Sequence, residues 1–581
     1  MAMYRCSLLV IFVLACAPAW GATYYVDATR GSDGNAGTAA ESAWKTVAKV
    51  NASTFSAGDS ILFKRGETWW ETLTPPSSGA AENPIIFGAY GSGANPVFDG
   101  SVEILGSPND WSCAANYCTK NIGAVKPNVI WINGLKQHEG SGKGNTLGDW
   151  TYNRPNIRLY AGPGKKPADV YISVFSGSKD AGIYIKDRDY IRITNITIRR
   201  FQDNGSPAYT TTSGGIILCN AHCGQVDGCS LADNGNGILV YNASGASIFN
   251  NTITGTYNKR SVPSGWGVLI ESDNVIVYGN VINQRGIFYN GTTAYVGHGI
   301  VCAIRNVSAG MGCANVKIHN NTVSYPYYYG INVSDLDSNS GDAPYLGIEI
   351  YENILTNGNP IGGDTDGISA GGQSVAGNAK GGMKVYRNRI DGYLNSGIQI
   401  TNLWHNVEVY YNVISNCGGS ASDYGWGGIK VRAGIPVYNN TIFNSYQDGI
   451  SLAGDGTTYN VYNNIIHTVN HTQAGHGRCI FVDKTGTANS RTNICYKSSN
   501  GLSGGAGTFN GAGNLTSDPC FVSTSTPDFH LLRNSPAIKA GTNVSLTTDH
   551  AGHPVPKAPD IGAYEYQGAS STPQAPQGLR F

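Results

Sequence analysis

A glycine followed by an aliphatic residue recurs through the middle of the chain, and this repeat constrains the fold more than any other sequence feature. Each pair opens a short stretch in which apolar and polar residues alternate, which is the pattern of a half-buried β-strand. The intervals of 21 to 37 residues are typical of a repeat protein in which each interval is one structural unit. The pairs begin at Gly182, Gly215, Gly237, Gly267, Gly299, Gly330, Gly367, Gly397, Gly428 and Gly449.

A second short strand is expected in most intervals, and it closes with an asparagine. We expect this asparagine at a turn, because left-handed backbone geometry and side-chain hydrogen bonds to the backbone suit it there. Asparagines stacked from coil to coil can also bond to one another in a ladder. The closing residues are Asn280, Asn321, Asn353, Asn388, Asn412, Asn440 and Asn464.

These two elements predict a parallel β-helix, an all-β solenoid. Each interval is then one coil of two or three strands, and each strand pairs in parallel with its equivalent in the next coil. Ten coils at about 4.8 Å each give a rod about 48 Å long. The 77 glycines and the small share of charged residues, 13%, suit short strands joined by tight turns. Nothing in the sequence indicates the eight amphipathic helices of a TIM barrel.

The start of the chain has the pattern of an export signal. Arg5 precedes an apolar run, and Ala19-Trp20-Gly21 offers a cleavage site with small flanking residues. The run is too short to span a bilayer, and no second transmembrane candidate follows. We therefore expect residues 1–21 to be a signal peptide. The protein is then secreted, periplasmic or on the cell surface, with lipid attachment at Cys16 as the alternative.

Both ends of the repeat need caps, because an open rod exposes strand edges. We expect an N-terminal cap and first coils over residues 22–127, the parallel β-helix over 128–503, a C-terminal cap over 504–567 and a linker-like tail over 568–581. The cap motifs include Tyr24-Tyr25-Val26-Asp27 at the start and Asp560-Ile-Gly-Ala-Tyr-Glu-Tyr566 at the end.

These caps and the coil repeat resemble the right-handed parallel β-helix proteins of the pectate-lyase-like superfamily, over nearly the whole chain after the signal. The resemblance implies a right-handed solenoid of about ten coils with a cap at each end. The superfamily includes polysaccharide lyases, glycoside hydrolases, epimerases, esterases and proteins without known activity. The fold therefore does not settle the function.

Several cysteines are close neighbours in the sequence, and in an exported protein such pairs predict local disulfides. Cys229, Cys417 and Cys520 have no obvious partner and are expected to be thiols. The candidate pairs are Cys113 with Cys118, Cys219 with Cys223, Cys302 with Cys313, and Cys479 with Cys495.

The alternation also predicts which side chains face outward. In each Gly-Ile-x-Val-x segment the aliphatic residues point inward, while the x residues and the residue before the glycine point outward. Equivalent outward residues of neighbouring coils should stack in columns, with successive residues of a column about 5 Å apart. The middle coils place aromatic and polar residues there. The candidate substrate-binding residues in these columns are Trp266, Glu271, Tyr329, Asn332, Gln399 and Asp448.

One candidate reaction is β-elimination on a uronate polymer. A base removes the weakly acidic proton α to the carboxylate, and the carboxylate must therefore be neutralised by a cation or an acid. Lys430 is the candidate base, with Arg432 as the neighbouring cation, and His298 is a further candidate catalytic residue. Calcium is the candidate cofactor, because it prefers carboxylate oxygens. Its candidate ligands are Asp335, Asp337, Asp364 and Asp366.

Hydrolysis is the alternative, and it uses two carboxylates that flank the glycosidic bond. Asp366 and Asp448 lie three coils apart, about 14 Å, which is too far for a direct pair. Asp366 paired with Asp364 or with the loop acids Asp335 and Asp337 fits better. Gly363-Asp-Thr-Asp-Gly-Ile368 resembles the Asn-Thr-Asp-Gly-Ile motif of polygalacturonases, which implies a catalytic Asp366. The Asp-Asp pair of that family is absent, and Gly297-His298-Gly299 precedes the acidic motif instead of following it.

The leading hypothesis is an enzyme that cleaves glycosidic bonds of a polysaccharide, by elimination on a uronate or by hydrolysis with paired aspartates. The different-class alternative is a non-catalytic glycan-binding or surface-structural β-helix, since outward aromatic residues also fit that function. The formal net charge of zero gives no sign of binding to nucleic acid or to an anionic membrane. We expect a monomer with a polysaccharide as its partner.

Overall fold

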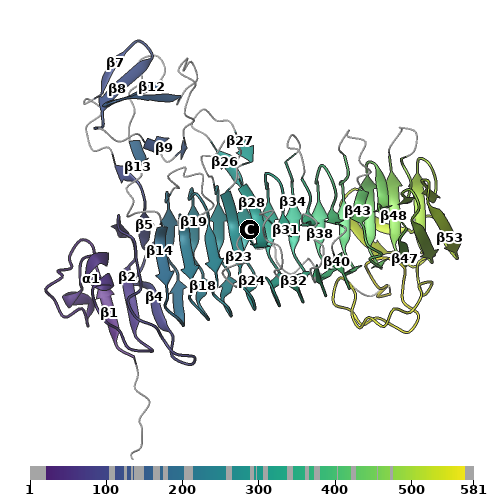
Figure 1. Ribbon diagram of the computed structural model, residues 1–581, viewed down its shortest axis with the longest axis horizontal. Helices are drawn as coiled ribbons and strands as arrows, with labels where there is room; N and C mark the ends of the chain where they lie inside the picture. The colour runs from purple at the N-terminus through teal and green to yellow at the C-terminus, as the bar shows by residue number, and fades with distance from the viewer. Residues whose placement is uncertain are drawn as a thin grey trace, which may run out of the picture.

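The computed structural model shows an all-β solenoid whose coils stack along one axis (Figure 1). Helical structure is confined to a 3-10 turn at Ala40–Ser42 and helix α1 at Val47–Asn51 within the described residues. Those residues are 21–103, 111–123, 127–132, 135–136, 149–160, 170–174, 181–201, 213–256, 265–287, 293–295, 297–304, 312–335, 345–359, 365–371, 380–401, 404–419, 427–454, 456–470 and 476–568.

Three long sheets run the length of the rod, and the strands of each pair in parallel with their equivalents in the next coil. Sheet A has 15 strands: β1 (Thr23–Val26), β2 (Ser60–Lys64), β4 (Ile85–Tyr90), β15 (Ile191–Thr194), β18 (Gln225–Asp227), β21 (Ser247–Phe249), β24 (Ile276–Tyr278), β29 (Lys317–His319), β33 (Glu349–Tyr351), β37 (Lys384–Tyr386), β41 (Glu408–Tyr410), β44 (Val437–Tyr438), β47 (Thr458–Tyr462), β50 (Thr487–Arg491) and β53 (Thr508–Ala512). Sheet B has 13 strands: β3 (Thr68–Trp69), β5 (Val97–Asp99), β16 (Thr197–Arg199), β19 (Ser230–Ala232), β22 (Thr252–Thr254), β25 (Val281–Asn283), β30 (Thr322–Ser324), β34 (Ile354–Thr356), β38 (Arg389–Asp391), β42 (Val413–Ser415), β45 (Thr441–Ser445), β48 (Ile465–Val469) and β51 (Ile494–Ser498). Sheet C has 12 strands: β14 (Ala181–Lys186), β17 (Gly214–Cys219), β20 (Ile238–Tyr241), β23 (Gly265–Glu271), β28 (Gly297–Ile304), β31 (Ile331–Asp335), β35 (Ile368–Ala370), β39 (Ile398–Ile400), β43 (Gly427–Val431), β46 (Asp448–Leu452), β49 (Ile480–Val482) and β52 (Ser503–Gly504).

The recurring glycine lies at a corner where successive coils pass very close to one another. An ideal Cβ on Gly299 would lie 2.1 Å from the carbonyl oxygen of Gly330, and one on Gly237 would lie 2.2 Å from that of Gly267. Only glycine fits such an approach without moving the backbone. The aliphatic residues that follow these glycines, such as Ile300, are fully buried inside the coils. Each Gly-Ile pair in the sequence therefore identifies a strand of sheet C.

Sheet C extends past the last Gly-Ile pair. Cys479 takes the position of the glycine before Ile480, because the Gly449 and Ile450 amides bond to the carbonyls of Arg478 and Cys479. Strand β49 therefore continues the sheet although it lacks the repeat, and β52 follows it.

The closing asparagines form a buried ladder inside the corner between sheets A and B. The Oδ1 of Asn388 accepts the backbone N–H of Asn353 at 3.1 Å and its side-chain Nδ2 at 2.9 Å. The same bonds recur in each coil and confirm the predicted ladder. Left-handed geometry, however, belongs to the residue before the ladder asparagine, such as Arg387 with a φ of 54°. The ladder members are Asn251, Asn280, Asn321, Asn353, Asn388, Asn412, Asn440, Asn464, Asn493 and Asn514.

A continuous stack of rings lies on the outer face of sheet A. Tyr386 and Tyr410, for example, have ring centroids 5.0 Å apart and planes within 3° of parallel. Because both faces of each inner ring contact a neighbouring ring, these rings offer only their edges to a ligand, and the stack is structural. Its members are Phe249, Tyr278, His319, Tyr351, Tyr386, Tyr410, Tyr438 and Tyr462.

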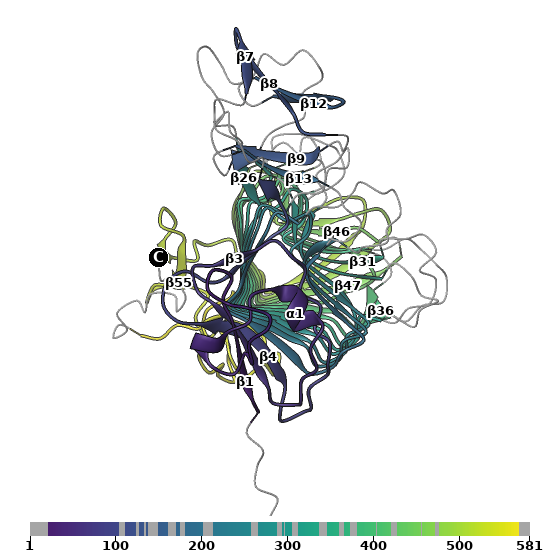
Figure 2. The same cartoon turned by 90° about the vertical axis from the view of Figure 1, so that its left-hand side faces the viewer.

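The described strands between Val102 and Val174 form an inserted unit that stands above the N-terminal half of the rod (Figures 1 and 2). The boundary predicted at residue 127, between the N-terminal cap and the parallel coils, falls inside this segment. Its strands pair antiparallel, in contrast to the coils. They form two four-stranded sheets: β6 (Val102–Glu103), β9 (Pro127–Ile132), β10 (Leu135–Lys136) and β13 (Val170–Val174); and β7 (Ser112–Ala114), β8 (Tyr117–Asn121), β11 (Trp150–Asn153) and β12 (Asn156–Tyr160).

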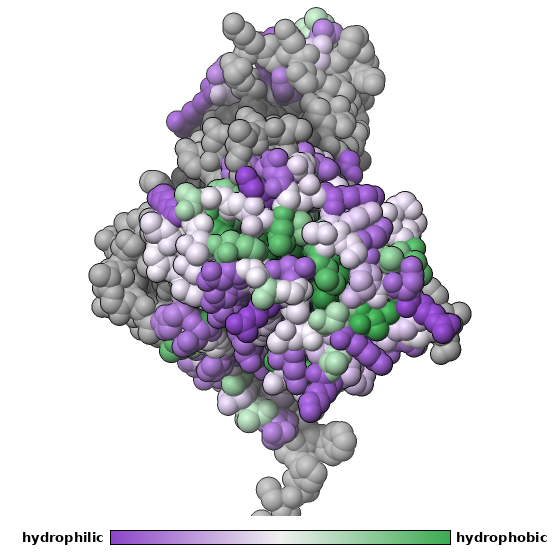
Figure 3. Space-filling view, turned by 90° about the vertical axis from the view of Figure 1, so that its right-hand side faces the viewer, coloured by the Kyte–Doolittle hydropathy of each residue, from purple (hydrophilic) through white to green (hydrophobic). Residues whose placement is uncertain are grey.

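The two ends of the rod close differently. Helix α1 packs Val47 and Val50 into the core at the N-terminal end, where Figure 2 looks along the axis. At the other end Leu502 and Phe509 pack partly buried against the core. Figure 3 shows hydrophobic surface in the middle of this face, with hydrophilic surface around it. Three minor pairings complete the fold: β26 (Arg285–Ile287) with β27 (Thr293–Tyr295); β32 (Tyr345–Leu346), β36 (Lys380–Gly381) and β40 (Trp404–His405); and β54 (Phe521–Ser523) with β55 (Asp528–Leu531).

Two of the four predicted disulfides are present, Cys113–Cys118 and Cys479–Cys495. The other two predictions are wrong, since these cysteines are thiols. Cys219 packs against the apolar cluster on the outer face of sheet C, whereas Cys223 lies in the turn after β17 with a φ of 54°. Cys302 and Cys313 are buried thiols, and Cys313 Sγ donates to the Ile270 carbonyl at 3.4 Å. Cys229, Cys417 and Cys520 are thiols, as predicted.

The C-terminal segment turns back along the rod and packs on sheets A and B. Val544, Leu546 and Val555 contact the buried tyrosines of the ring stack. The Ala563 amide bonds to Thr441 Oγ1 at 3.0 Å, and the Gly562 amide to the Asn463 carbonyl at 2.8 Å. Among the described residues, no helix is long and apolar enough to cross a membrane.

A buried carboxyl in this segment predicts a loss of stability in alkali. Burial and, secondarily, the nearby Asp560 raise the pKa of Glu565 to about 8. The raised pKa contributes its full share to the free energy of unfolding when the pH is below the unfolded pKa of about 4.5. That contribution is lost as the pH rises through 8, where the folded carboxyl ionises. Glu565→Gln should therefore lessen the drop in unfolding free energy between pH 5 and pH 9 by a few kcal/mol, roughly 2–4.

Urea unfolding at the two pH values measures the effect of Glu565→Gln. Glu82→Gln, at an exposed carboxylate, is the matched control and should leave the drop unchanged. An equal drop in wild type and Glu565→Gln would show that Glu565 is ionised in the folded chain.

Candidate active site on sheet C

The register of sheet C aligns the outward side chains in columns, as the alternation predicts. Asn332 pairs with Val301 on one side and Ser369 on the other, and Lys430 pairs with Gln399 and Ser451. Trp266 pairs with His298 in the column that precedes the glycines. The first outward column therefore runs in the order Leu269, Val301, Asn332, Ser369, Gln399, Lys430, Ser451 and Phe481.

This column changes from apolar to polar and back. Leu269 and Val301 belong to an apolar cluster on the outer face of the sheet, and Trp266 packs against that cluster. The polar stretch runs from Asn332 to Ser451, and Phe481 ends it. Although these side chains point outward, most are buried, with 5% of Asn332 and 6% of Lys430 exposed. Successive side chains within a column are only about 4.8 Å apart and cover one another's flanks, so an outward position is not necessarily an exposed one.

Buried polar atoms without a hydrogen-bond partner gather on this face. In the part of the chain that the structure describes, six such atoms lie on the outward columns between β28 and β46. A buried polar atom left unpaired costs roughly 1–3 kcal/mol, so such atoms are usually bonded by protein, water or a ligand. We name this set the polar face of sheet C: His298 Nδ1, Asn332 Oδ1, Ser396 Oγ, Gln399 Oε1, Arg432 Nε and Ser451 Oγ.

His298 lies at the aromatic end of the polar face. Its ring stacks on Tyr328, with centroids 5.4 Å apart, and on Tyr329, with centroids 5.8 Å apart. Burial lowers the pKa of His298 to about 4. The ring is therefore neutral near pH 7, where it can exchange hydrogen bonds with a ligand but carries no charge to stabilise an anion.

Two buried aspartates lie in the column that precedes the glycines. Asp366 Oδ1 accepts the Ser396 backbone N–H at 2.9 Å. Asp448 accepts the Arg478 backbone N–H at 3.1 Å and the Nδ1 of His476 at 2.9 Å. Neither aspartate is exposed. They are three rungs apart, about 14 Å, which exceeds the spacing of roughly 6.5–9.5 Å between the carboxyl groups of an inverting glycosidase.

His476 and Ser396 are site residues that the sequence analysis did not identify. His476 precedes β49, the strand in which Cys479 takes the position of the glycine. The last Gly-Ile pair is in the coil before it, so the repeat did not identify the coil of His476. Its proximity to Asp448 is a tertiary contact across 28 residues. The sequence signal available was the spacing of Ile450 and Ile480, which matches the intervals of the repeat.

The remaining predicted residues divide between the two regions of the face. Glu271 is buried, with 1% exposed, and pairs with Tyr241 in the second outward column. Tyr329 is half-buried beside His298. Asp335 ends β31, but nothing is described of its side chain, and Asp337 and Asp364 lie outside the described residues.

Of the four predicted calcium ligands, the structure therefore describes the side chain of Asp366. One of its carboxylate oxygens is committed to the Ser396 amide. Among the described residues, no group of three or more His, Cys, Asp or Glu side chains is placed to hold a metal ion. Calcium binding stays a prediction.

Comparisons with known proteins agree with this architecture. Residues 165–342 match a family model described as a right handed beta helix region. The solved complex of XylC with xylose superimposes over 93% of this chain and 98% of its own, with a TM-score of 0.52 at 13% identity. Pectate lyase Pel9A covers 94% of this chain and 97% of its own, with a TM-score of 0.42 at 14% identity. The chain is a right-handed parallel β-helix protein.

A curated relative matches a short part of the chain. It is a lacto-N-biosidase of Bifidobacterium longum subsp. longum, 35% identical over 117 residues. The match spans 19% of this chain and 7% of the relative. The solved lacto-N-biosidase of family GH136 from Eubacterium ramulus covers 85% of this chain and 67% of its own, with a TM-score of 0.37 at 15% identity.

Proposed function

We propose that this protein is an enzyme that cleaves glycosidic bonds of a polysaccharide bound along the polar face of sheet C. The observation that carries the proposal is the row of buried, unpartnered polar atoms between His298 and Ser451. Sugars present many hydroxyl groups that donate and accept hydrogen bonds, so a polysaccharide can satisfy such a row. The row follows the axis of the rod, with rungs about 4.8 Å apart.

The finer proposal is β-elimination on a uronate. Lys430 lies on the outward side of β43 and Arg432 directly follows this strand, one coil before the Ser451 end of the face. Arg432 Nε is a buried donor without an acceptor, and a substrate carboxylate would satisfy it. In this reaction Arg432 binds the uronate carboxylate, and Lys430 removes the adjacent proton as the base.

Hydrolysis is the second candidate, favoured by the short match to a lacto-N-biosidase and by the buried carboxylates Asp366 and Asp448. Their separation of about three rungs argues against direct partnership. A hydrolase here would need Asp366 to work with an acid from the neighbouring loops. We also propose Asp364, Asp335 and Asp337 as partners of Asp366, either in hydrolysis or in binding Ca²⁺. The substrate panel and the chelator experiment below test these two roles.

A panel of acidic and neutral polysaccharides tests the function. Elimination leaves a conjugated double bond, so we expect new ultraviolet absorbance together with new reducing ends on a uronate polymer. Reducing ends without absorbance would show hydrolysis. Binding without either product would show a glycan-binding protein and would contradict the enzyme proposal.

Removal of metal ions tests calcium on the same substrate. If Asp366 and the loop acids hold Ca²⁺, a chelator should abolish cleavage, and added Ca²⁺ should restore it while Mg²⁺ does not, because Mg²⁺ demands a tighter octahedral set of ligands. Calcium should also raise the melting temperature, since a ligand that binds the folded state stabilises it. Unchanged activity and melting temperature in chelator would contradict a calcium site.

A further inference from the structure

A buried aspartate holds a histidine at one end of the polar face. Asp448 Oδ2 lies 2.9 Å from His476 Nδ1, and the Asp448 side chain is completely buried while 15% of the His476 side chain is exposed. A carboxylate that accepts Nδ1–H fixes the ring orientation and directs Nε2 away from it. It also balances the positive charge that forms when the ring takes up a second proton.

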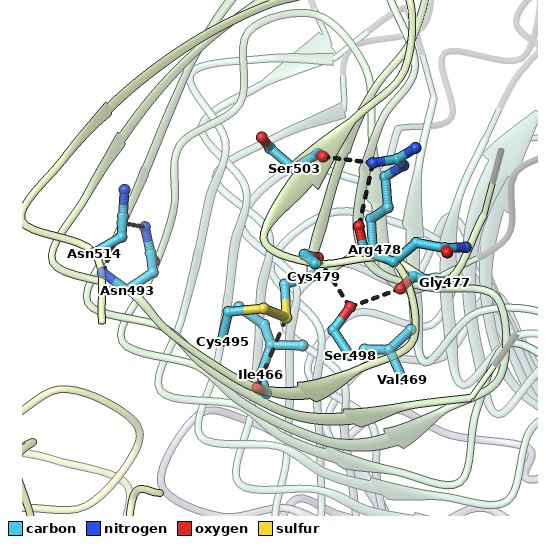
Figure 4. Close-up of a disulfide and its surroundings, with 12 residues drawn as sticks. Ile466, Val469, Gly477, Arg478, Cys479, Asn493, Cys495, Ser498, Ser503 and Asn514 are labelled. Carbon is cyan, nitrogen blue, oxygen red and sulfur yellow. Dashed lines mark hydrogen bonds between the residues drawn. A yellow bond between two sulfur atoms is a disulfide. The ribbon is translucent and has the colours of Figure 1, made fainter. Parts of the chain in front are cut away.

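The backbone that carries His476 is held on several sides. The Gly477 amide bonds to the Gln447 carbonyl at 2.8 Å, and the Gly477 carbonyl accepts Ser498 Oγ at 2.6 Å. Arg478 donates its amide to Asp448 and its guanidinium to the Ser503 carbonyl at 2.7 Å. Figure 4 shows the Ser498–Gly477 and Arg478–Ser503 contacts beside the Cys479–Cys495 disulfide, which constrains the residue after Arg478.

The histidine ring lies over the column of outward side chains. It stacks on Phe481, with centroids 5.4 Å apart and planes 28° apart. Phe481 pairs with Ser451, the last member of the polar face, and Ser451 pairs with Lys430. The imidazole is thus about two rungs, roughly 10 Å, along the axis from the backbone of Lys430. The long lysine side chain can shorten that interval to a few ångströms, and the α proton and the glycosidic oxygen lie on neighbouring carbons of the one sugar ring between the two groups.

We infer that His476 is the catalytic acid of the proposed cleavage and that Asp448 is its positioning residue. In the elimination, the Lys430 amine takes the proton α to the carboxylate, and that C–H electron pair becomes the new C=C bond. The bond from the sugar to the glycosidic oxygen breaks, and His476 gives its Nε2 proton to that oxygen. Proton exchange with water then restores Lys430 and His476. This inference rests on the proposed function.

The test compares variants that keep the size of each side chain. His476→Gln should lower kcat by on the order of 10²-fold or more, the usual contribution of a general acid, while KM stays within about twofold. Asp448→Asn should also lower kcat with little change in KM. The asparagine has no negative charge to balance the protonated His476 ring and orients that ring less firmly. His530→Gln is the matched control: His530 also bonds to an aspartate, Asp528, at 2.6 Å, but in the C-terminal segment.

Chemical rescue separates catalysis from structure. His476→Gly should be restored at least tenfold by added imidazole, and His530→Gly should not respond. Full activity of His476→Gln, or a loss that imidazole does not restore and that accompanies a lowered melting temperature, would overturn the inference while the proposed function stands. A wild-type protein that cleaves no polysaccharide of the panel would instead overturn the proposed function, and the inference with it.

Discussion

Replacing Lys430 by methionine is expected to lower the rate of uronate cleavage by on the order of 10²–10⁴-fold, the usual contribution of a general base. Methionine keeps most of the length of the side chain, which is only 6% exposed, so the packing should survive. The amine is the group removed, and with it the acceptor for the sugar proton. Initial rates by ultraviolet absorbance at saturating substrate measure the loss.

The matched variant is Asp366→Asn. The asparagine amide keeps an oxygen for the Ser396 amide, which Asp366 Oδ1 accepts at 2.9 Å, so the fold should be retained. Elimination that does not depend on Ca²⁺ at Asp366 predicts a large loss in Lys430→Met and a small one in Asp366→Asn, whereas a calcium ligand at Asp366 predicts a loss in Asp366→Asn that excess Ca²⁺ lessens. The reverse pattern would establish hydrolysis by a carboxylate. Lys384→Met, at an exposed lysine of sheet A, controls for loss of a positive charge and should be fully active.

The second large effect is expected in the asparagine ladder. Asn388→Ala should lower the free energy of unfolding by about 3–6 kcal/mol, because each buried polar group left unpaired costs roughly 1–3 kcal/mol. The substitution removes the acceptor of the Asn353 amide and side chain. It also removes the side-chain donor to the Ile350 carbonyl at 2.9 Å and to the Tyr386 carbonyl at 3.1 Å. Chemical denaturation followed by circular dichroism measures the change.

Asn489→Ala is the control for that prediction. Asn489 also bonds to the asparagines of the neighbouring coils, Asn460 at 3.5 Å and Asn510 at 3.2 Å, but on the half-exposed outer face of sheet A. Water replaces those bonds, so its loss should cost less than about 0.5 kcal/mol. Equal losses of unfolding free energy in the two variants would show that burial does not determine how much the asparagine ladder stabilises the fold.

Much of the fold could be predicted from the sequence because the coil is a local, repeated unit. The Gly-Ile pairs identified ten strands of sheet C, and the alternation placed Lys430 and Asn332 outward in the correct register. The ladder was predicted in the same way. The inserted unit at 102–174 was missed as a separate unit, because its antiparallel strands carry no signal of this period.

The candidate site was harder to predict, because it depends on contacts between coils. Asp448 was identified by its place before a glycine, but its partner His476 belongs to the coil in which Cys479 replaces that glycine. Two of four cysteine pairs were predicted wrongly, since closeness in sequence does not decide whether two sulfurs meet in space.

The sequence by itself determined the solenoid, the inward and outward faces and the order of side chains along sheet C. All of these follow from a backbone alternation of two residues and a repeat that each coil satisfies with its nearest neighbours. The tertiary structure alone decided which outward polar atoms are buried without a partner and that Asp448 holds His476. Burial and hydrogen bonding depend on what neighbouring coils place around an atom, and no single coil contains that information.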